Sequence, residues 1–273
     1  MSIAVDQRFW TPVAQLEVAG EHLGVWRHGD TGPAVVAAHG IEDGWESWGA
    51  VAERIGARHR VYALDRPWRA GNRYAWPDRD DPAGWLRRAI DLVPEPADLL
   101  LGHSFGANAI LQHVAESPDR LPALLLTPFY RPSTVAEDQK LYERTLADFH
   151  TIIGDGLRLR LGPRAANVDD ALLTAMVQQT VRRVGSRGLM AMFDQFRHTT
   201  RLRLSDMDTP VLVLTGPDDV AMTPARAAAF AAAAPSAAVC VLPDLTHFCH
   251  LAQVEQVATV LTEFLDHQGS GSS

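Results

Sequence analysis

Lysine and cysteine are nearly absent from this sequence. Among 273 residues Lys140 is the one lysine, so arginine carries almost all of the positive charge. The two cysteines, Cys240 and Cys249, are too few for the disulfide framework of a secreted protein and lack metal-site spacing, so we expect free thiols. The formal net charge of -8 argues against a general nucleic-acid-binding protein.

Long apolar runs are missing as well. No segment is long and apolar enough to span a bilayer, and residues 1–8 have no apolar core of the kind found in signal peptides. We therefore expect a cytoplasmic protein with no membrane contact. Residues 269–273 contain only glycine and serine, and we expect them to form a flexible tail or a remnant of cloning.

The composition suits one large domain. A hydrophobic fraction of 47% and a charged fraction of 21% are typical of a globular protein. A chain of this length can bury a core without disulfides or metal ions. We therefore expect a single α/β domain that carries an inserted segment.

Short apolar segments alternate with helix-like segments over most of the chain. Two alternating segments, 13–18 and 22–27, predict an antiparallel hairpin. The run 34–38 is apolar without alternation, as in a strand that is covered on both faces. Strands that alternate with helices imply a parallel sheet, whose ligands bind beyond the carboxyl ends of the strands. Further strands are expected at 60–64, 99–101, 121–126, 211–214 and 239–242, and helices at 47–55, 85–92, 107–116, 224–234 and 253–265.

The alternation stops between residues 128 and 209. Thr134 and Glu137 fit a capping box at the start of one helix. Apolar residues recur at helical intervals in two further segments, 169–184 and 189–196. We therefore expect a helical insertion here.

The stretch Gly102-His103-Ser104-Phe105-Gly106 has the G-x-S-x-G pattern of a nucleophile elbow. It lies where an apolar, strand-like run gives way to a helix-like run beginning at Ala107. In such an elbow a strained turn projects the serine Oγ from the edge of the sheet, and the glycines leave it room. The pattern alone is weak, so the rest of the chain must support it.

A serine hydroxyl needs a base to take its proton, and the base needs a third group to orient it. In the order serine, acid, histidine, the acid follows a late strand and the histidine precedes the last helix. Asp219 follows the strand at 211–214, with Asp218 as its rival. His247 lies before the last helix and is favoured over His250, which we interpret as a polar residue facing the helix start.

These motifs together resemble those of the α/β-hydrolase superfamily, of the lid-bearing esterase and C–C hydrolase type. They are His39-Gly40-Ile41, the elbow, Gly216-Pro217-Asp218-Asp219 with Pro224, and Thr246-His247. The resemblance covers nearly the whole chain. It implies an eight-stranded, mostly parallel sheet with helices on both faces and an inserted helical lid. The core would comprise residues 1–127 and 210–268, and the lid residues 128–209.

The resemblance also implies the roles of the site residues. Ser104 would be the nucleophile, His247 the base and Asp219 the acid, with the backbone amides of Ile41 and Phe105 as the oxyanion hole. His39 and His103 would be structural hydrogen-bonding residues. The chain departs from the family in the loop 65–73, which lacks the usual small, glycine-rich segment, and at Thr246, where a glycine is common.

Aromatic and sulfur-containing side chains near the expected mouth of the site are candidate substrate contacts, although packing in the core explains such residues equally well. The candidates are Trp45, Trp68, Met192 and Phe196.

The expected lid is basic. Residues 144–203 contain ten arginines against five aspartates, a net charge of +5. This charge is either a solvated face or a landing site for an acidic carrier protein or an anionic ligand.

The function predicted from these observations is hydrolysis of an ester, thioester or related acyl bond of a small, largely apolar substrate through an acyl-enzyme at Ser104. We expect no metal and no cofactor. A serine at the elbow disfavours the dehalogenase and epoxide hydrolase branches, which use an aspartate there. The alternatives are a lyase or cyclase step on the same triad, and a ligand receptor with little turnover.

Overall fold

The computed structural model describes residues 9–117 and 120–270. Within them eight strands form one sheet in the order β1-β2-β4-β3-β5-β6-β7-β8. β1 and β2 form the expected hairpin, β2 pairs with β4 antiparallel, and the remaining strand pairs are parallel. The strands are β1 (Thr11–Val18), β2 (Glu21–His28), β3 (Ala34–Ala38), β4 (Arg60–Asp65), β5 (Leu99–His103), β6 (Ala123–Leu126), β7 (Val211–Thr215) and β8 (Ala237–Val241).

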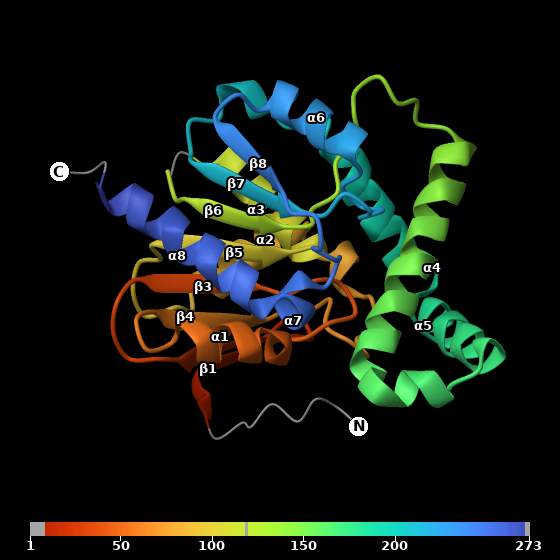
Figure 1. The fold of residues 1–273 in the computed structure, drawn as a ribbon, viewed down its shortest axis with the longest axis horizontal. Helices are drawn as coiled ribbons and strands as arrows, with labels where there is room; N and C mark the ends of the chain where they lie inside the picture. The colour runs from red at the N-terminus through yellow and green to blue at the C-terminus, as the bar shows by residue number, and fades with distance from the viewer. Residues whose placement is uncertain (1–8, 118–119, 271–273) are drawn as a thin grey trace.

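Helices cover both faces of this sheet, as expected (Figure 1). One face is covered by α1 (Gly49–Ile55), α7 (Cys249–Ala252) and α8 (Val254–Ser270). The other is covered by α2 (Pro82–Ile90), α3 (Phe105–Glu116) and α6 (Pro224–Ala233). The short 3-10 helices are η2 (Trp45–Trp48), η3 (Trp76–Asp78), η4 (Gly162–Asn167) and η5 (Leu204–Asp206).

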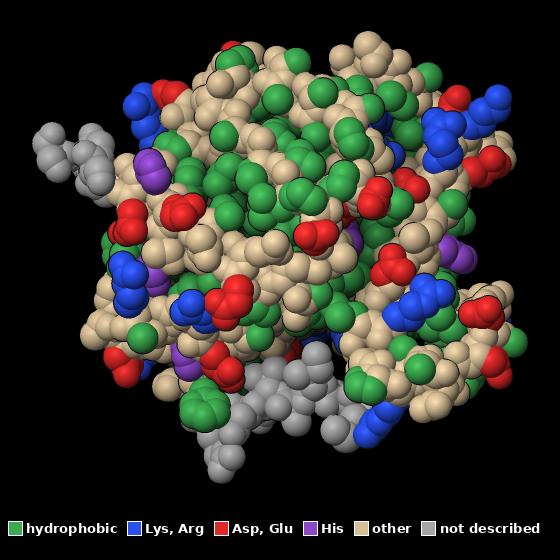
Figure 2. All heavy atoms as spheres, in the orientation of Figure 1, with side chains coloured by type: hydrophobic (Ala, Val, Ile, Leu, Met, Phe, Trp, Pro, Cys, Tyr) green, Lys and Arg blue, Asp and Glu red, His purple; other side chains and the backbone are tan. Residues whose placement is uncertain are grey.

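Two hydrophobic cores lie on the two faces of the sheet. In β3, Ala34, Val36 and Ala38 face one core, while Val35 and Ala37 face the other, and all five are fully buried. Successive side chains of a strand point to opposite faces of the sheet. Because both faces of β3 are covered by a core, every position is apolar and the sequence shows no alternation. Figure 2 shows hydrophobic side chains gathered over β7 and β8.

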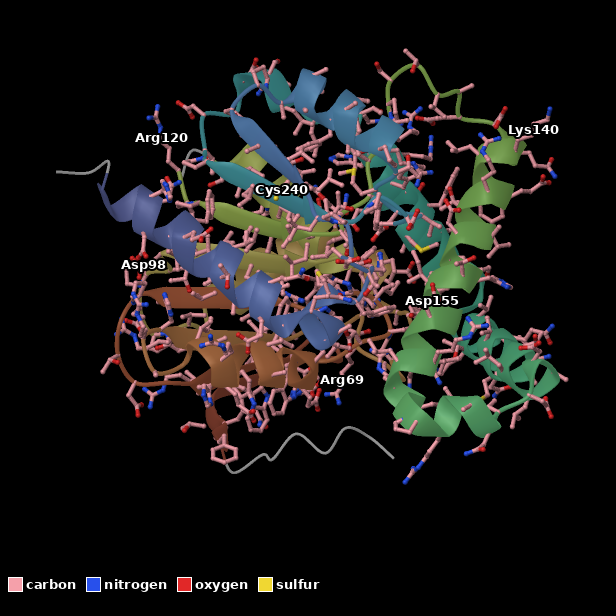
Figure 3. The ribbon with its side chains drawn as sticks, viewed as in Figure 1. Arg69, Asp98, Arg120, Lys140, Asp155 and Cys240 are labelled. Carbon is pink, nitrogen blue, oxygen red and sulfur yellow. The ribbon has the colours of Figure 1, made fainter. Side chains whose placement is uncertain are left out.

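Between β6 and β7 the chain forms two long helices, α4 (Gln139–Leu161) and α5 (Asp170–His198), at the carboxyl end of the sheet (Figure 1). α5 is kinked at Gly185, where φ is 63°. Lys140 lies at the start of α4 and Asp155 further along it (Figure 3). We refer to residues 128–209 as the helical insertion.

Two local expectations were wrong. The expected capping box does not form, because Asp138 caps α4 and Glu137 pairs with Arg131 instead. α8 continues to Ser270, so it includes Gly269 and Ser270 of the expected tail, while 271–273 lie outside the described residues. No helix in the described part of the chain is both long enough and apolar enough to cross a membrane.

Candidate active site

Ser104 occupies the sharp turn between β5 and α3. Its φ of 51° lies in the left-handed region, which a residue with a side chain rarely adopts. A Cβ at Gly106 would lie 2.4 Å from the carbonyl oxygens of Ala38 and His39, and one at Gly102 would lie 2.6 Å from Cα of Ala107. Only glycine fits at these two positions, so the strand-turn-helix geometry expected of the elbow is present.

Ser104, His247 and Asp219 are joined by hydrogen bonds. Nε2 of His247 lies 3.0 Å from Oγ of Ser104, and Nδ1 of His247 lies 3.0 Å from Oδ2 of Asp219. All three residues are buried. With the Nδ1 proton directed at the carboxylate, Nε2 presents a lone pair to the serine hydroxyl, which is the arrangement of a general base with its orienting acid.

The choice between the two adjacent aspartates follows from their surroundings. Asp218 is exposed, whereas Asp219 is buried and its Oδ1 accepts hydrogen bonds from the amides of Ala221 and Met222 at 2.7 and 3.2 Å. Burial by itself would raise the pKa of Asp219, but the charge of His247 and these hydrogen bonds hold it below its usual value. Asp219 is therefore an anion beside the imidazole at neutral pH.

Two side chains at the carboxyl ends of β5 and β6 hold the backbone of His247. Nε2 of His103 donates to the carbonyl oxygen of His247 at 2.9 Å, and Oγ1 of Thr127 donates to the same oxygen at 3.0 Å. His103 is therefore a structural hydrogen-bonding residue, as expected. Thr127 was not singled out from the sequence, since a threonine after a strand gives no signal of a contact 120 residues away.

The β3–η2 loop (residues 39–44) forms another wall of the site. Nδ1 of His39 donates to the carbonyl oxygen of Gly40 at 2.7 Å, and its Nε2 accepts from the amide of Arg66 at 3.3 Å. Burial, followed by the charge of Arg66, lowers the pKa of His39 to about 3. The imidazole is therefore neutral and serves to shape the loop.

A cavity of about 50 Å³ opens beside Ser104, between the loop and the helical insertion. A second cavity of about 40 Å³ adjoins it, because Met192 and Phe129 line both. Phe196 lines the second cavity. Met192 therefore lines the cavity beside Ser104, whereas Phe196 lines only the second one. The first cavity is lined by Gly40, Ile41, Glu42, His103, Ser104, Phe129, Phe149, Ile152, Ile153, Arg160, Met192, His247 and Phe248.

The two tryptophans expected to contact substrate line neither cavity. Trp45 is buried and stacks on Trp26 with ring centroids 4.3 Å apart. Trp68 is fully buried against Trp76 and Phe105, and its Nε1 donates to the carbonyl oxygen of His39. The prediction for Trp45 and Trp68 was wrong, because both side chains are buried in hydrophobic cores, Trp45 on one face of the sheet and Trp68 on the other.

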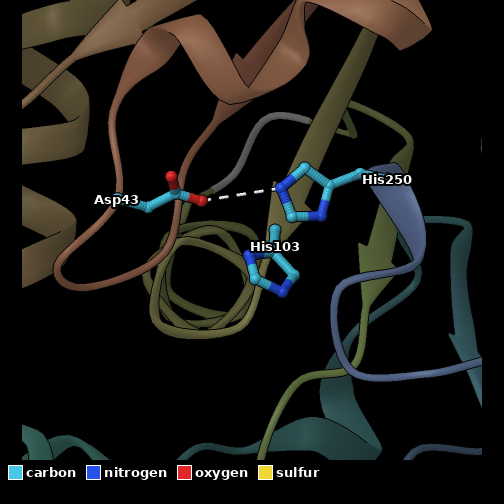
Figure 4. Close-up of side chains that lie close together, drawn as sticks. All are labelled: Asp43, His103 and His250. Atoms are coloured by element: carbon cyan, nitrogen blue, oxygen red, sulfur yellow. Dashed lines mark ion pairs between the residues drawn. The ribbon is translucent and has the colours of Figure 1, made fainter. Parts of the chain in front are cut away.

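Behind the nucleophile lies a buried cluster of Asp43, His103 and His250 (Figure 4). Their candidate ligand atoms lie within 4.8 Å of one another, and Nε2 of His250 lies 3.5 Å from Oδ2 of Asp43. Such a donor set is of the kind that binds zinc. Here, however, Nη2 of Arg160 lies 2.8 Å from Oδ1 of Asp43, so a guanidinium already compensates the carboxylate charge. We interpret the cluster as an ion-pair network.

His250, expected as a polar residue facing a helix start, lies in the first turn of α7. It is fully buried there, with its ring 4.1 Å from that of His103. Burial lowers the pKa of His250, although Asp43 acts in the opposite sense. The pattern of polar residues before the last helix could not distinguish a buried histidine from an exposed one.

Comparison with known proteins places this fold and site in context. A model of the alpha/beta hydrolase family matches residues 35–260. Comparison with curated proteins finds no match.

Solved structures share the fold at low sequence identity. A thioesterase domain from the curacin biosynthetic pathway is 16% identical, with a TM-score of 0.66 over 93% of this chain and 99% of that one. An epoxide hydrolase from Vigna radiata is 17% identical, with a TM-score of 0.68 over 95% and 99%. A loop variant of a haloalkane dehalogenase from Bradyrhizobium elkanii is 16% identical, with a TM-score of 0.66 over 97% and 99%. Because the family model spans most of its length, the chain belongs to the alpha/beta hydrolase family.

Proposed function

We propose that this protein hydrolyses an ester, thioester or related acyl bond through an acyl-enzyme at Ser104. The observation that supports the proposal most is the hydrogen-bonded series Ser104, His247, Asp219 at the carboxyl end of the sheet. Nε2 of His247 takes the hydroxyl proton as Oγ attacks the carbonyl carbon, and returns it to the departing alcohol or thiol. Water, deprotonated by the same nitrogen, then attacks the acyl-enzyme and releases the acid.

The developing oxyanion would be bound by the backbone amides of Ile41 and Phe105. Phe105 is the first residue of α3, so its amide points away from the helix and adds the partial positive charge of the helix N-terminus. Ile41 lies in the wall of the cavity that contains Ser104. Preorganised donors of this kind are each worth about 100-fold or more in rate.

The lining of the cavity favours a substrate with a small, largely apolar acyl or alcohol group. Besides Met192 and Phe196, the side chains of Phe129, Phe149 and Ile152 line the two adjoining cavities. A serine at the elbow, in place of an aspartate, supports acyl transfer over the chemistry named for the dehalogenase and epoxide hydrolase structures.

A thioester on an acidic carrier protein is one substrate that would explain the basic helical insertion. Three of its arginines are exposed and form no ion pair within the residues that the structure describes. They are Arg144, Arg182 and Arg201. An anionic carrier would be attracted to this surface before its acyl group enters the cavity.

Labelling with a fluorophosphonate tests the nucleophile. Only a serine whose proton is drawn off by a neighbouring base reacts readily, so the wild type should gain one adduct and Ser104→Ala none, as measured by intact mass. Steady-state release of p-nitrophenol from short esters then separates an enzyme from a receptor, and product identification separates hydrolysis from a lyase or cyclase step. A wild type without an adduct, or an equally labelled Ser104→Ala variant, would contradict the assignment.

A further inference from the structure

The two residues that follow Ile41 are buried acids, and each is paired with an arginine of the helical insertion. Glu42 pairs with Arg183 on α5, and Asp43 pairs with Arg160 on α4 at 2.8 Å. The carboxyl side chains are only 2% and 7% exposed. The arginine side chains are 44% exposed in Arg183 and 35% exposed in Arg160, so each pair is half-buried and is screened by solvent less than a fully exposed ion pair.

The same loop is also held by the segment that departs from the family pattern, residues 65–73, and by Tyr74, which follows it. The hydroxyl of Tyr74 donates to Oε1 of Glu42 at 2.6 Å, and the amide of Glu42 donates to the carbonyl oxygen of Trp68 at 3.1 Å. The amide of Ala70 donates to the carbonyl oxygen of Asp43 at 2.7 Å. Glu42 itself has a φ of 55°, so its backbone needs such external contacts to stay in place.

We propose that Arg183, acting through Glu42, is a positioning residue that fixes the β3–η2 loop and thereby aims the amide of Ile41 at the reacting carbonyl. This inference rests on the proposed acyl transfer. In it the helical insertion does more than cover the cavity, because it supplies part of the support that assembles the oxyanion hole. Arg160 acts on Asp43 in the same sense, but it also lines the cavity.

Arg183 is the better test residue, because it lines neither cavity beside Ser104. Arg187, which lies four residues further along α5 and beyond the kink at Gly185, offers a control. It also joins the insertion to the core, through Asp78 at 2.7 Å, but its carboxylate partner is 59% exposed, whereas Glu42, the partner of Arg183, is 2% exposed. Exposed pairs of this kind contribute little.

The first experiment compares Arg183→Gln with Arg187→Gln in the full chain. Each preparation is titrated with the fluorophosphonate so that kcat refers to active sites. We expect Arg183→Gln to lower kcat for a short ester by about tenfold or more with little change in KM, since a misplaced oxyanion donor loses transition-state binding. Arg187→Gln should stay within about twofold of the wild type.

A thionoester provides a readout that loss of stability would not change. Sulfur is a larger and weaker hydrogen-bond acceptor than oxygen, so the ratio of kcat for an ester to that for its thionoester reports whether the amide donors are in place. We expect this ratio to fall in Arg183→Gln and to be partly restored in Arg183→Lys. The double variant Glu42→Gln, Arg183→Gln should be no slower than Glu42→Gln alone, because Arg183 acts through Glu42.

Amide hydrogen exchange tests the loop without requiring turnover. Exchange in the peptide covering residues 39–48 should be faster in Arg183→Gln and unchanged in Arg187→Gln. Equal kcat values and equal exchange in the two variants would overturn the inference. A different result would overturn the proposed function alone: a wild type that neither reacts with the fluorophosphonate nor turns over esters, although loop exchange still increases in Arg183→Gln. The role of Arg183 in holding the β3–η2 loop would then stand.

Discussion

At the scale of single residues, the carboxylate beside His247 is the most direct test of the site. Asp219→Asn should reduce turnover far more than Asp218→Asn, because the asparagine amide favours the wrong imidazole tautomer and leaves the charged imidazole unsupported. A comparable change in a serine protease costs about 10⁴ in kcat. Asp218 is exposed, so its replacement should change kcat by less than about twofold.

The measurement is kcat for a short ester, with folding of both variants checked by circular dichroism. Equal losses, or a larger loss in Asp218→Asn, would assign the acid to Asp218. The sequence narrowed the choice to these two residues by their position after a strand. It could not separate them, because burial and the amides of Ala221 and Met222 distinguish them only in the folded chain.

The buried histidines predict that the protein loses stability in mild acid. The pKa of His39 is about 3 when folded and about 6.5 when unfolded, chiefly because of burial. Below pH 6.5 the unfolded chain therefore binds a proton that the folded one does not, and the free energy of unfolding falls as the pH falls. One such histidine costs about 2 kcal/mol between pH 7 and pH 5.

Urea unfolding of the wild type and of His39→Gln at several pH values between 5 and 7 measures this effect. The variant should be less stable at pH 7 but should lose less stability on acidification. Asp65, whose pKa burial raises to about 6, acts with the opposite sign, and the comparison cancels its contribution. Parallel curves for the two proteins would show that His39 takes up its proton in the folded state.

At the scale of the elements, the packing of α4 against the site predicts opposite changes in stability when two of its glycines are replaced by alanine. A Cβ at Gly154 would meet its nearest atoms at 3.6 and 3.7 Å, which is ordinary contact. Gly154→Ala should therefore raise the free energy of unfolding by about 0.5 to 1 kcal/mol, since alanine favours a helix interior. A Cβ at Gly156 would lie 2.7 Å from Cζ of Phe248, the residue after His247.

Gly156→Ala should therefore destabilise the protein and lower kcat, because α4 or Phe248 must move next to His247. Thermal unfolding and ester turnover of the two variants check both statements. If the two substitutions have the same effect, then α4 does not pack closely on Phe248.

Several strands and the positions of the site residues could be predicted from the sequence alone. The apolar runs at the central strands predicted the sheet, because a strand that is buried on both faces needs apolar side chains at nearly every position. The elbow, the acid and the histidine could be predicted because Ser104 directly follows β5, while Asp219 and His247 lie in the loops after β7 and β8. The predicted start of α4 was wrong, because Thr134, Glu137 and Asp138 all offer capping groups. The ion pair of Glu137 with Arg131 leaves Asp138 as the cap, and this pair is visible only in the folded chain.

Aromatic residues were predicted less well for a similar reason. Trp45 and Trp68 follow the β3–η2 loop and β4 in sequence, but in the folded chain Trp45 stacks on Trp26 in one hydrophobic core and Trp68 packs on Phe105 in the other. Likewise the ion pairs of Glu42 with Arg183 and of Asp43 with Arg160 join residues more than 100 positions apart. No local pattern reveals contacts of that range.

At the scale of the whole molecule, the structure divides the arginines of the helical insertion into two groups. Most of the ten arginines in residues 144–203 are in ion pairs, and those at 160, 183 and 187 bind the core. Reversing Arg183 would therefore disturb the packing of the insertion on the core as well as the surface charge. A clean test of electrostatic attraction must use the exposed arginines at 144, 182 and 201.

Reversing Arg144, Arg182 and Arg201 to glutamate should lower kcat/KM for a carrier-bound or coenzyme A-linked thioester and spare a neutral ester. Attraction of this kind acts on association. The difference should therefore be largest at low salt and fade as the Debye length shortens from about 10 Å at 0.1 M to about 3 Å at 1 M. Kinetics with the three substrates over a range of ionic strength measure it.

A control with the same change in net charge separates a local effect from a global one. Arg58, Arg79 and Arg87 lie outside the insertion, are exposed, and form no ion pair within residues 9–117 and 120–270. Reversing these three should leave the preference for the anionic thioester nearly unchanged, because their charges are distributed over the core. If both triple variants lose the preference equally, net charge alone attracts the substrate; if neither does, the insertion is a solvated face and a simple ester becomes the better substrate.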